Sequence, residues 1–224
     1  MSFPWCVVLT ADLPGKTRAA LLKDAIWEPD ATISVAFLEG DLELHKRIRS
    51  VAEQWIEATS ARLRLLWRPV GADATIRISF GFAGSWSRLG KQAELVEDQS
   101  LPTMNFGWLT PDSTDLAVQE VVLHEFGHAL GLIHEHSSPE ANIPWDRKAV
   151  IRELSLPPNS WSVAQIEHNV LRGYDRADVR ATPFDPDSIM LYPIKSEWTD
   201  GKLVTKNNTK LSARDIELIR STYA

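Results

Sequence analysis

The sequence predicts an α+β fold with a mixed, twisted sheet and two long helices in an N-terminal lobe. A loop-rich C-terminal lobe that ends in a helix should follow, with an active-site cleft between the lobes. Three observations support this prediction. The first half combines segments of period 2 with segments of helical period, the second half is rich in proline, serine and asparagine, and the last fourteen residues are again amphipathic.

The first half contains three segments that read as strands around one helix. Residues 31–39 alternate apolar and polar side chains, as a half-buried strand does. A helix should cover residues 41–62, where apolar side chains recur at helical spacing. Residues 63–68 and 74–80 predict two further strands, and the glycine-broken stretch 81–90 predicts a loop.

A short strand is expected at residues 103–108, followed by a helix that opens near Ser113 to Asp115. Beyond this helix, residues 137–145, 156–161 and 182–188 should be mostly irregular. The final helix has a capping-box start at Ser212 and Asp215.

Composition excludes several classes of partner. A chain of 224 residues with a net charge of −6 lacks the basic surface that nucleic acids or anionic membranes require, and we expect neither as a partner. No apolar run approaches the roughly 18 residues that span a bilayer. We expect a monomer.

Cys6 is the single cysteine, so an internal disulfide is excluded. The first residues also lack a basic segment followed by a long apolar core, and do not predict a signal peptide. Either the protein is made without a leader or a leader is missing from this sequence. Secreted and cytoplasmic locations both stay open.

The stretch HEFGHALGLIHEH, residues 124–136, predicts a metal site. His124 and His128 are four residues apart, so on a helix they project from one face toward a single ion. Gly131 allows a sharp turn after the helix, and that turn lets His134 supply a third imidazole. Three neutral ligands and one open position are typical of one catalytic Zn²⁺ ion.

Glu125 is the predicted general base, because it adjoins His124 and reaches a water held by the ion. Zinc lowers the pKa of that water from 15.7 to roughly 7, and Glu125 would pass the proton to the leaving group. A short histidine-glutamate-histidine motif also arises by chance. The long motif fixes five positions in eleven, which makes chance a poor explanation.

At these residues the chain resembles the metzincin zinc metallopeptidases, whose motif is followed by a turn that carries a methionine. Here SIMLYP supplies the turn, and the resemblance implies that Met190 lies beneath the zinc ligands. The match is closest to the astacin-like branch, in which a glutamate follows the third histidine and a tyrosine stands two residues after the methionine. These residues are Glu135 and Tyr192, and GSWSRLG resembles an astacin loop.

The resemblance implies roles for these residues. Tyr192 would be a displaceable zinc ligand that hydrogen-bonds the oxyanion during catalysis, and Glu135 would contact the new amino terminus after removal of a pro-segment. No recognisable pro-segment is present, and whether Glu135 makes this contact stays open. Ser85 replaces a cysteine of the family, so the chain looks like a disulfide-free, bacterial-style relative.

The resemblance extends from about Trp27 to the end. It predicts an N-terminal extension at residues 1–26 and a catalytic domain at 27–224, with lobes at about 27–131 and 132–224. Within the extension, Cys6 is either a thiolate that blocks zinc in a latent form or a small apolar residue, which we favour.

Substrate contacts are predicted at the strand before the zinc helix. By its position this is the family's edge strand, so Thr103, Met104, Asn105 and Phe106 should pair with an extended peptide. The family's pocket beside the scissile bond has walls that follow the methionine turn, here residues 193–203. His136 could support a zinc ligand or bind another ion, but its spacing does not fit the first zinc ion, and we favour a surface polar residue.

The sequence therefore predicts a zinc endopeptidase that acts on peptides or proteins. Two alternatives stay open. One is a binding or toxin-type module that holds zinc without general proteolysis. The other is an amide hydrolase dedicated to one peptide metabolite.

Overall fold

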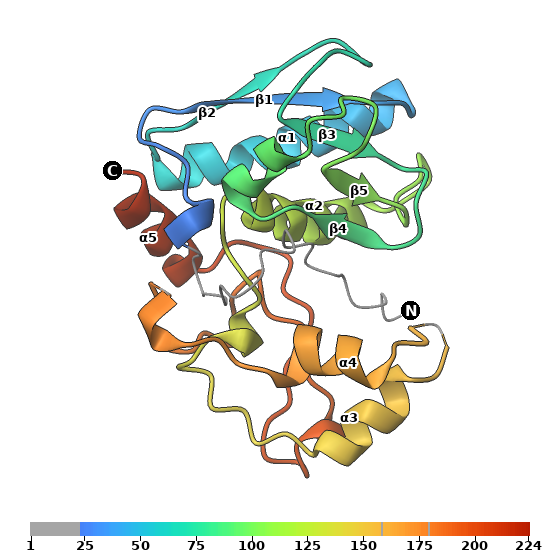
Figure 1. The fold of residues 1–224 in the computed structure, drawn as a ribbon, viewed down its shortest axis with the longest axis vertical. Coiled ribbons are helices and arrows are strands. Elements are labelled where there is room, and N and C mark those ends of the chain that lie inside the picture. The colour runs from blue at the N-terminus through green and yellow to red at the C-terminus, as the bar shows by residue number, and fades with distance from the viewer. Residues whose placement is uncertain (1–22, 158, 179) are drawn as a thin grey trace.

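A computed structural model describes residues 23–157, 159–178 and 180–224. Figure 1 shows a sheet with α1 and α2 packed beneath it, and a second layer of loops with α3 and α4 on the far side of α2. This arrangement confirms the predicted α+β class. Within the described residues, no helix has the length and apolar character needed to cross a membrane.

The sheet has five strands in the order β2-β1-β3-β5-β4. Strands β2, β1, β3 and β5 run parallel to one another, and β4 runs antiparallel to β5. The strands are β1 (Thr32–Phe37), β2 (Arg64–Trp67), β3 (Ile76–Ser79), β4 (Ser85–Ser87) and β5 (Met104–Phe106). The sheet is thus mixed, as predicted.

Two long helices cover one face of this sheet, α1 (Leu42–Thr59) and α2 (Asp115–Ala129). The later helices are α3 (Arg147–Leu154), α4 (Val163–Ile166), which runs into a π-helical turn at Glu167–Leu171, and α5 (Ala213–Thr222). Short 3₁₀ turns lie at Lys23–Ala25, Gly90–Leu95, Glu135–Ser137, Arg176–Asp178 and Ser196–Trp198. The predicted capping box of α5 is present, with Ser212 and Asp215 each bonded to the other's backbone N–H.

Two expectations about local structure are wrong. The stretch 81–90, expected to be a loop, contains β4, because backbone pairing with β5 orders three residues between glycines. The second half also has more regular structure than expected. Helix α3 starts where Asp146 accepts hydrogen bonds from the N–H groups of Lys148 and Ala149, between two stretches that are irregular as predicted.

The predicted role of residues 103–106 as an edge strand is also wrong. Strand β5 lies between β3 and β4, so neighbouring strands flank it on both sides. The side chains of Thr103, Met104, Asn105 and Phe106 are all buried. The edge strand on this side is β4, because the chain folds back after β3 and adds one antiparallel strand outside β5.

Two apolar cores support the two layers. The first core lies between the sheet, α1 and α2, and includes Ile219 and Tyr223 of the terminal segment. Helix α5 therefore packs against α1 although it follows the loop-rich half in sequence. The second core joins α3, α4 and the segment after residue 190, with Trp198 fully buried among them.

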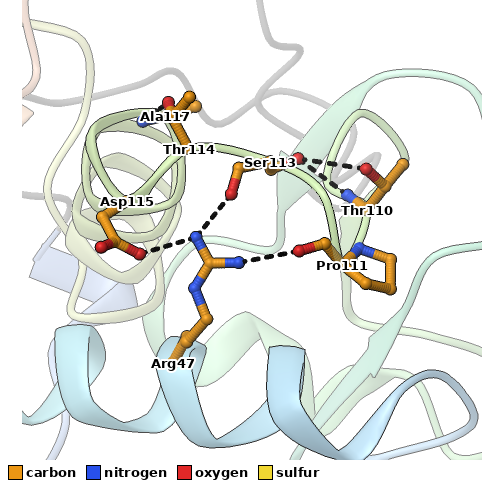
Figure 2. A network of polar contacts seen from close by, with 7 residues as sticks. All are labelled: Arg47, Thr110, Pro111, Ser113, Thr114, Asp115 and Ala117. Carbon is orange, nitrogen blue, oxygen red and sulfur yellow. Dashed lines mark hydrogen bonds and ion pairs between the residues drawn. The ribbon is translucent and has the colours of Figure 1, made fainter.

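The start of α2 is fixed by one arginine of α1. Figure 2 shows the Arg47 guanidinium between the loop before α2 and the first residue of that helix. It donates to the carbonyl oxygens of Pro111 at 3.2 Å and Ser113 at 2.6 Å, and to the Asp115 carboxylate at 2.8 Å. Helix α2 also has a cap from its own N-cap residue, because the Thr114 hydroxyl accepts a hydrogen bond from the N–H of Ala117.

Replacing Arg47 with methionine should therefore destabilise the fold. The apolar stem is kept, but three hydrogen bonds at the α2 start are lost, which costs about 1–2 kcal/mol. Urea unfolding followed by tryptophan fluorescence measures this difference. Lys46→Met is the matched control, because Lys46 forms an exposed ion pair with Glu43, and its loss should leave the unfolding midpoint unchanged. Equal midpoints for both variants would contradict the role of Arg47.

Candidate metal centre and adjoining pocket

Helix α2 carries two of the predicted metal ligands, His124 and His128, through the centre of the molecule. Every residue from Val121 to Ala129 is buried, so this part of the helix has no solvent-facing side. The helix ends as predicted, because Gly131 takes a φ of +94°, a conformation that favours glycine. The chain then turns toward His134.

The last carbonyl groups of α2 are satisfied by distant aromatic side chains. The Trp27 indole N–H donates to the Ala129 carbonyl at 2.8 Å, and the Tyr223 hydroxyl donates to the Leu130 carbonyl at 2.7 Å. These carbonyls have no partner within the helix and would otherwise be buried without hydrogen bonds. Both ends of the described chain thus hold the turn at Gly131.

The methionine turn packs directly against the last turn of α2. A Cβ atom on Gly127 would lie 2.3 Å from the Met190 Sδ and 3.2 Å from the Trp55 ring, so only glycine fits without displacing them. The turn itself is held from α5, since Asp215 accepts hydrogen bonds from the Ser188 hydroxyl and the Ile189 N–H. Met190 therefore lies next to the metal-binding motif, as the resemblance implied.

His124, His128 and His134 converge with ligand atoms within 4.8 Å of one another. The Nδ1 atoms of His124 and His128 lie 2.9 Å and 2.7 Å from the carbonyl oxygens of Ile189 and Leu132. A carbonyl oxygen only accepts, so both Nδ1 atoms carry the proton and both Nε2 atoms offer a lone pair.

The distance between two of these nitrogens fits a tetrahedral ion. The Nε2 atoms of His128 and His134 are 3.2 Å apart. Tetrahedral zinc with Zn–N bonds of about 2.0–2.1 Å separates two ligand nitrogens by about 3.3 Å. The three buried imidazoles are thus positioned to bind one metal ion.

Burial also sets the protonation state of the three ligands. It lowers the pKa of His124 to about 4, and it holds the pKa values of His128 and His134 well below the usual histidine range. The other imidazoles of the cluster lower the pKa values of His128 and His134 further. All three rings are therefore neutral near pH 7, the state that binds metal.

Glu125 and Tyr192 lie beside these ligands. Glu125 is 1% exposed and follows His124 on α2. The Tyr192 ring centroid is 5.1 Å from that of His124 and 4.5 Å from that of His134. The structure therefore brings both predicted catalytic side chains to the metal-binding residues.

His136 is not a surface residue, so that expectation is wrong. Its side chain is 3% exposed, and its ring stacks on His134 with centroids 5.1 Å apart. Its Nε2 donates to the Asn169 carbonyl at 3.0 Å, and burial lowers its pKa to about 4. Trp145 and the π-helical turn, which belong to the second core, cover His136. Both lie outside the segment around His136, so the local sequence does not predict its burial.

Glu135 lies in a cavity on one side of the methionine turn. Ser188 and Met190 line this cavity, whereas Ile189 and Leu191 line a separate pocket, because alternate residues of the turn face opposite ways. The Glu135 carboxylate accepts from the Asp185 N–H, and burial raises its pKa to about 7. Residues 1–22 lie outside the described residues, so Cys6 and any contact of Glu135 with the amino terminus do too.

The second pocket opens next to the metal ligands. Of the predicted wall at residues 193–203, only Pro193 lines it, and Asn207 and Asn208 form the rest of that side. The remaining lining residues are Trp108, Glu120, Val121, His124, Glu125, Ile189, Leu191 and Tyr192. Sequence reasoning missed Glu120, although its place four residues before His124 puts it on the same helical face.

Comparison with known families and structures agrees with this geometry. The model of the peptidase family described as Astacin matches residues 21–224. A structure of myroilysin superposes with a TM-score of 0.86 at 32% sequence identity, covering 91% of this chain and 97% of that chain. A second, crystal structure of myroilysin gives a TM-score of 0.69 at 31% identity, covering 97% and 90%.

Curated relatives match over part of their own length. Astacin-like metalloprotease toxin 5 of Loxosceles gaucho is 31% identical over 100 residues, which cover 45% of this chain and 48% of the toxin. Zinc metalloproteinase nas-30 of Caenorhabditis elegans is 22% identical over 222 residues, which cover 93% of this chain and 26% of that protein. The chain thus spans about half of the length of the toxin and about a quarter of the length of nas-30.

The purified protein should contain close to one zinc ion per chain by elemental analysis. His128→Ala should lose most of it, because two remaining imidazoles hold zinc weakly. His168→Ala is the matched control, since His168 is not among the three converging ligands, and should keep its zinc. Full zinc occupancy in the His128→Ala protein would refute the assignment.

Proposed function

Because this chain belongs to the astacin family of peptidases, we propose that it is a zinc-dependent endopeptidase that hydrolyses peptide bonds with water. The observation that carries the proposal is the convergence of three buried imidazoles beside a buried glutamate, with His124 and that glutamate lining a pocket. Three protein ligands leave a coordination position for water, as catalytic zinc sites do. A closed structural site would use four.

In this proposal His124, His128 and His134 hold the ion. When bound, zinc lowers the pKa of a coordinated water to about 7 and polarises the scissile carbonyl. Glu125 accepts the proton of the attacking water and delivers it to the leaving nitrogen. Its position supports this role, since it lines the pocket next to the ligand His124 and is screened from solvent.

Tyr192 has two proposed roles. Its ring lies against two of the three ligand imidazoles, which supports its role as an additional, displaceable metal ligand. On displacement its hydroxyl donates a hydrogen bond to the oxyanion of the scissile group. A preorganised donor at that position stabilises the charge that develops in the transition state.

The proposed substrate is an extended segment of a peptide or protein. The free edge of β4 replaces residues 103–106 as the strand that would pair with it, because β5 has neighbours on both sides. We propose residues 27–224 as the catalytic domain, after an extension at 1–26. We also propose that the protein acts as a monomer.

Glu125→Gln should retain zinc and lose nearly all peptide cleavage. The amide keeps the shape of the side chain but accepts no proton, and loss of a general base lowers the rate by about 10²–10⁴. Casein digestion, with and without a chelator, gives the assay, and elemental analysis gives the zinc content. Undiminished hydrolysis would place the base elsewhere. A zinc-loaded wild-type protein that cleaves neither casein nor peptides would favour the alternative of a zinc-holding binding module.

Tyr192→Phe should lower kcat by about 10²–10³ with little change in KM, because it removes a donor that acts in the transition state. Tyr174→Phe is the matched control. Tyr174 packs against a separate apolar cluster of Ala25, Leu89 and Ile133, so this variant should keep the wild-type kcat. Steady-state kinetics on one fluorogenic peptide separates kcat from KM. A Tyr192→Phe protein with kcat within about twofold of wild type would remove Tyr192 from the mechanism but leave the zinc peptidase intact.

A further inference from the structure

The pocket beside the metal ligands combines apolar walls with one carboxylate that catalysis does not use. Trp108, Val121 and Leu191 contribute apolar walls. Two carboxylates line the pocket, Glu120 and Glu125, and only Glu125 is needed for proton transfer. None of the described residues that line the pocket is a lysine or an arginine.

Glu120 is fixed in the pocket from both sides. On α2 it lies one turn before His124, so its side chain projects from the same helical face as a metal ligand. Across the pocket, Asn207 makes a side-chain hydrogen bond to its carboxylate. The neighbouring pair Gln119 and Thr209 are also bonded, at 2.9 Å, so the segment that bears Asn207 lies firmly against α2.

The charge of Glu120 has no cationic partner in the described residues. None of the ion pairs there includes Glu120. Burial raises the pKa of its carboxyl group, only the Asn207 hydrogen bond opposes that shift, and no cation contributes. The pocket therefore holds a partly desolvated negative charge, which a cationic guest would stabilise.

We propose that Glu120 makes this pocket select lysine or arginine as the substrate residue on the amine side of the scissile bond. These side chains match the pocket in both parts, since an apolar stem contacts the walls and a cationic end meets the carboxylate. The amine side follows because Glu125, which delivers a proton to the leaving nitrogen, lines the same pocket. The inference rests on the proposed endopeptidase function and names its substrate class.

Four quenched fluorescent peptides that differ only at this residue test the inference: lysine, arginine, norleucine and glutamate. The readout is the ratio of kcat/KM values within each protein, which cancels any general loss of activity. Wild type should favour lysine over norleucine by about 10–100-fold, the range for a hydrogen bond to a charged group. Glu120→Gln should reduce that ratio to within about twofold, and Glu120→Lys should invert it in favour of glutamate.

Glu57→Gln is the matched control, because Glu57 is an exposed carboxylate of α1 outside the pocket and should keep the wild-type ratio. A second arm measures the dissociation constants of the lysine and norleucine peptides for zinc-loaded Glu125→Gln protein. Addition of Glu120→Gln to that protein should abolish the difference between the two peptides.

The outcomes separate the inference from the proposed function. Cleavage of all four peptides at similar rates, or a lysine preference that survives Glu120→Gln, overturns the role of Glu120 and leaves the endopeptidase in place. Failure of wild type to cleave any peptide, with a Glu120-dependent preference in binding, overturns the endopeptidase and supports the cation-selective pocket. Loss of both cleavage and selective binding overturns both.

Discussion

Helix α2 is buried along its histidine-bearing half, and this burial governs the surrounding structure. A buried helix needs partners for both its ends and close neighbours on all its sides. Arg47 and Thr114 are hydrogen-bond partners at the N-terminal end of α2, and Trp27 and Tyr223 are partners at its C-terminal end. On the side of the methionine turn, the absence of a side chain at Gly127 lets Met190 approach. The same burial keeps the imidazoles neutral.

Local sequence predicts the parts of this arrangement that depend on spacing along one element. The metal ligands, Gly131 and the capping box of α5 all follow from helix geometry and turn chemistry. The position of a strand within the sheet does not, because it depends on which segment pairs with which. Strand β4 has only three residues, too few for a periodic signal, and its addition outside β5 moves the edge away from residues 103–106.

The residues around the metal ligands also divide into features that local sequence predicts and features that depend on distant segments. Glu120 shares a face of α2 with His124, but its chemical setting depends on Asn207, which is 87 positions further along the chain. His136 is polar and lies in a short 3₁₀ turn, yet the second core buries it through Trp145 and the π-helical turn. Helix faces are thus predictable from sequence, whereas burial by later segments requires the tertiary structure.

The hydrogen bonds of Tyr223 also bear on how the protein folds. Its hydroxyl joins the end of α2 to the backbone of Trp27, a residue 196 positions away in sequence. Contacts between such distant segments form late, because the entropy cost of closing a long loop comes before the contacts stabilise the fold. Until Tyr223 docks, the Leu130 carbonyl lacks this hydrogen bond, and the turn that leads to His134 lacks support on that side. The third imidazole is therefore held in place only when segments from both ends of the described chain have docked against the end of α2.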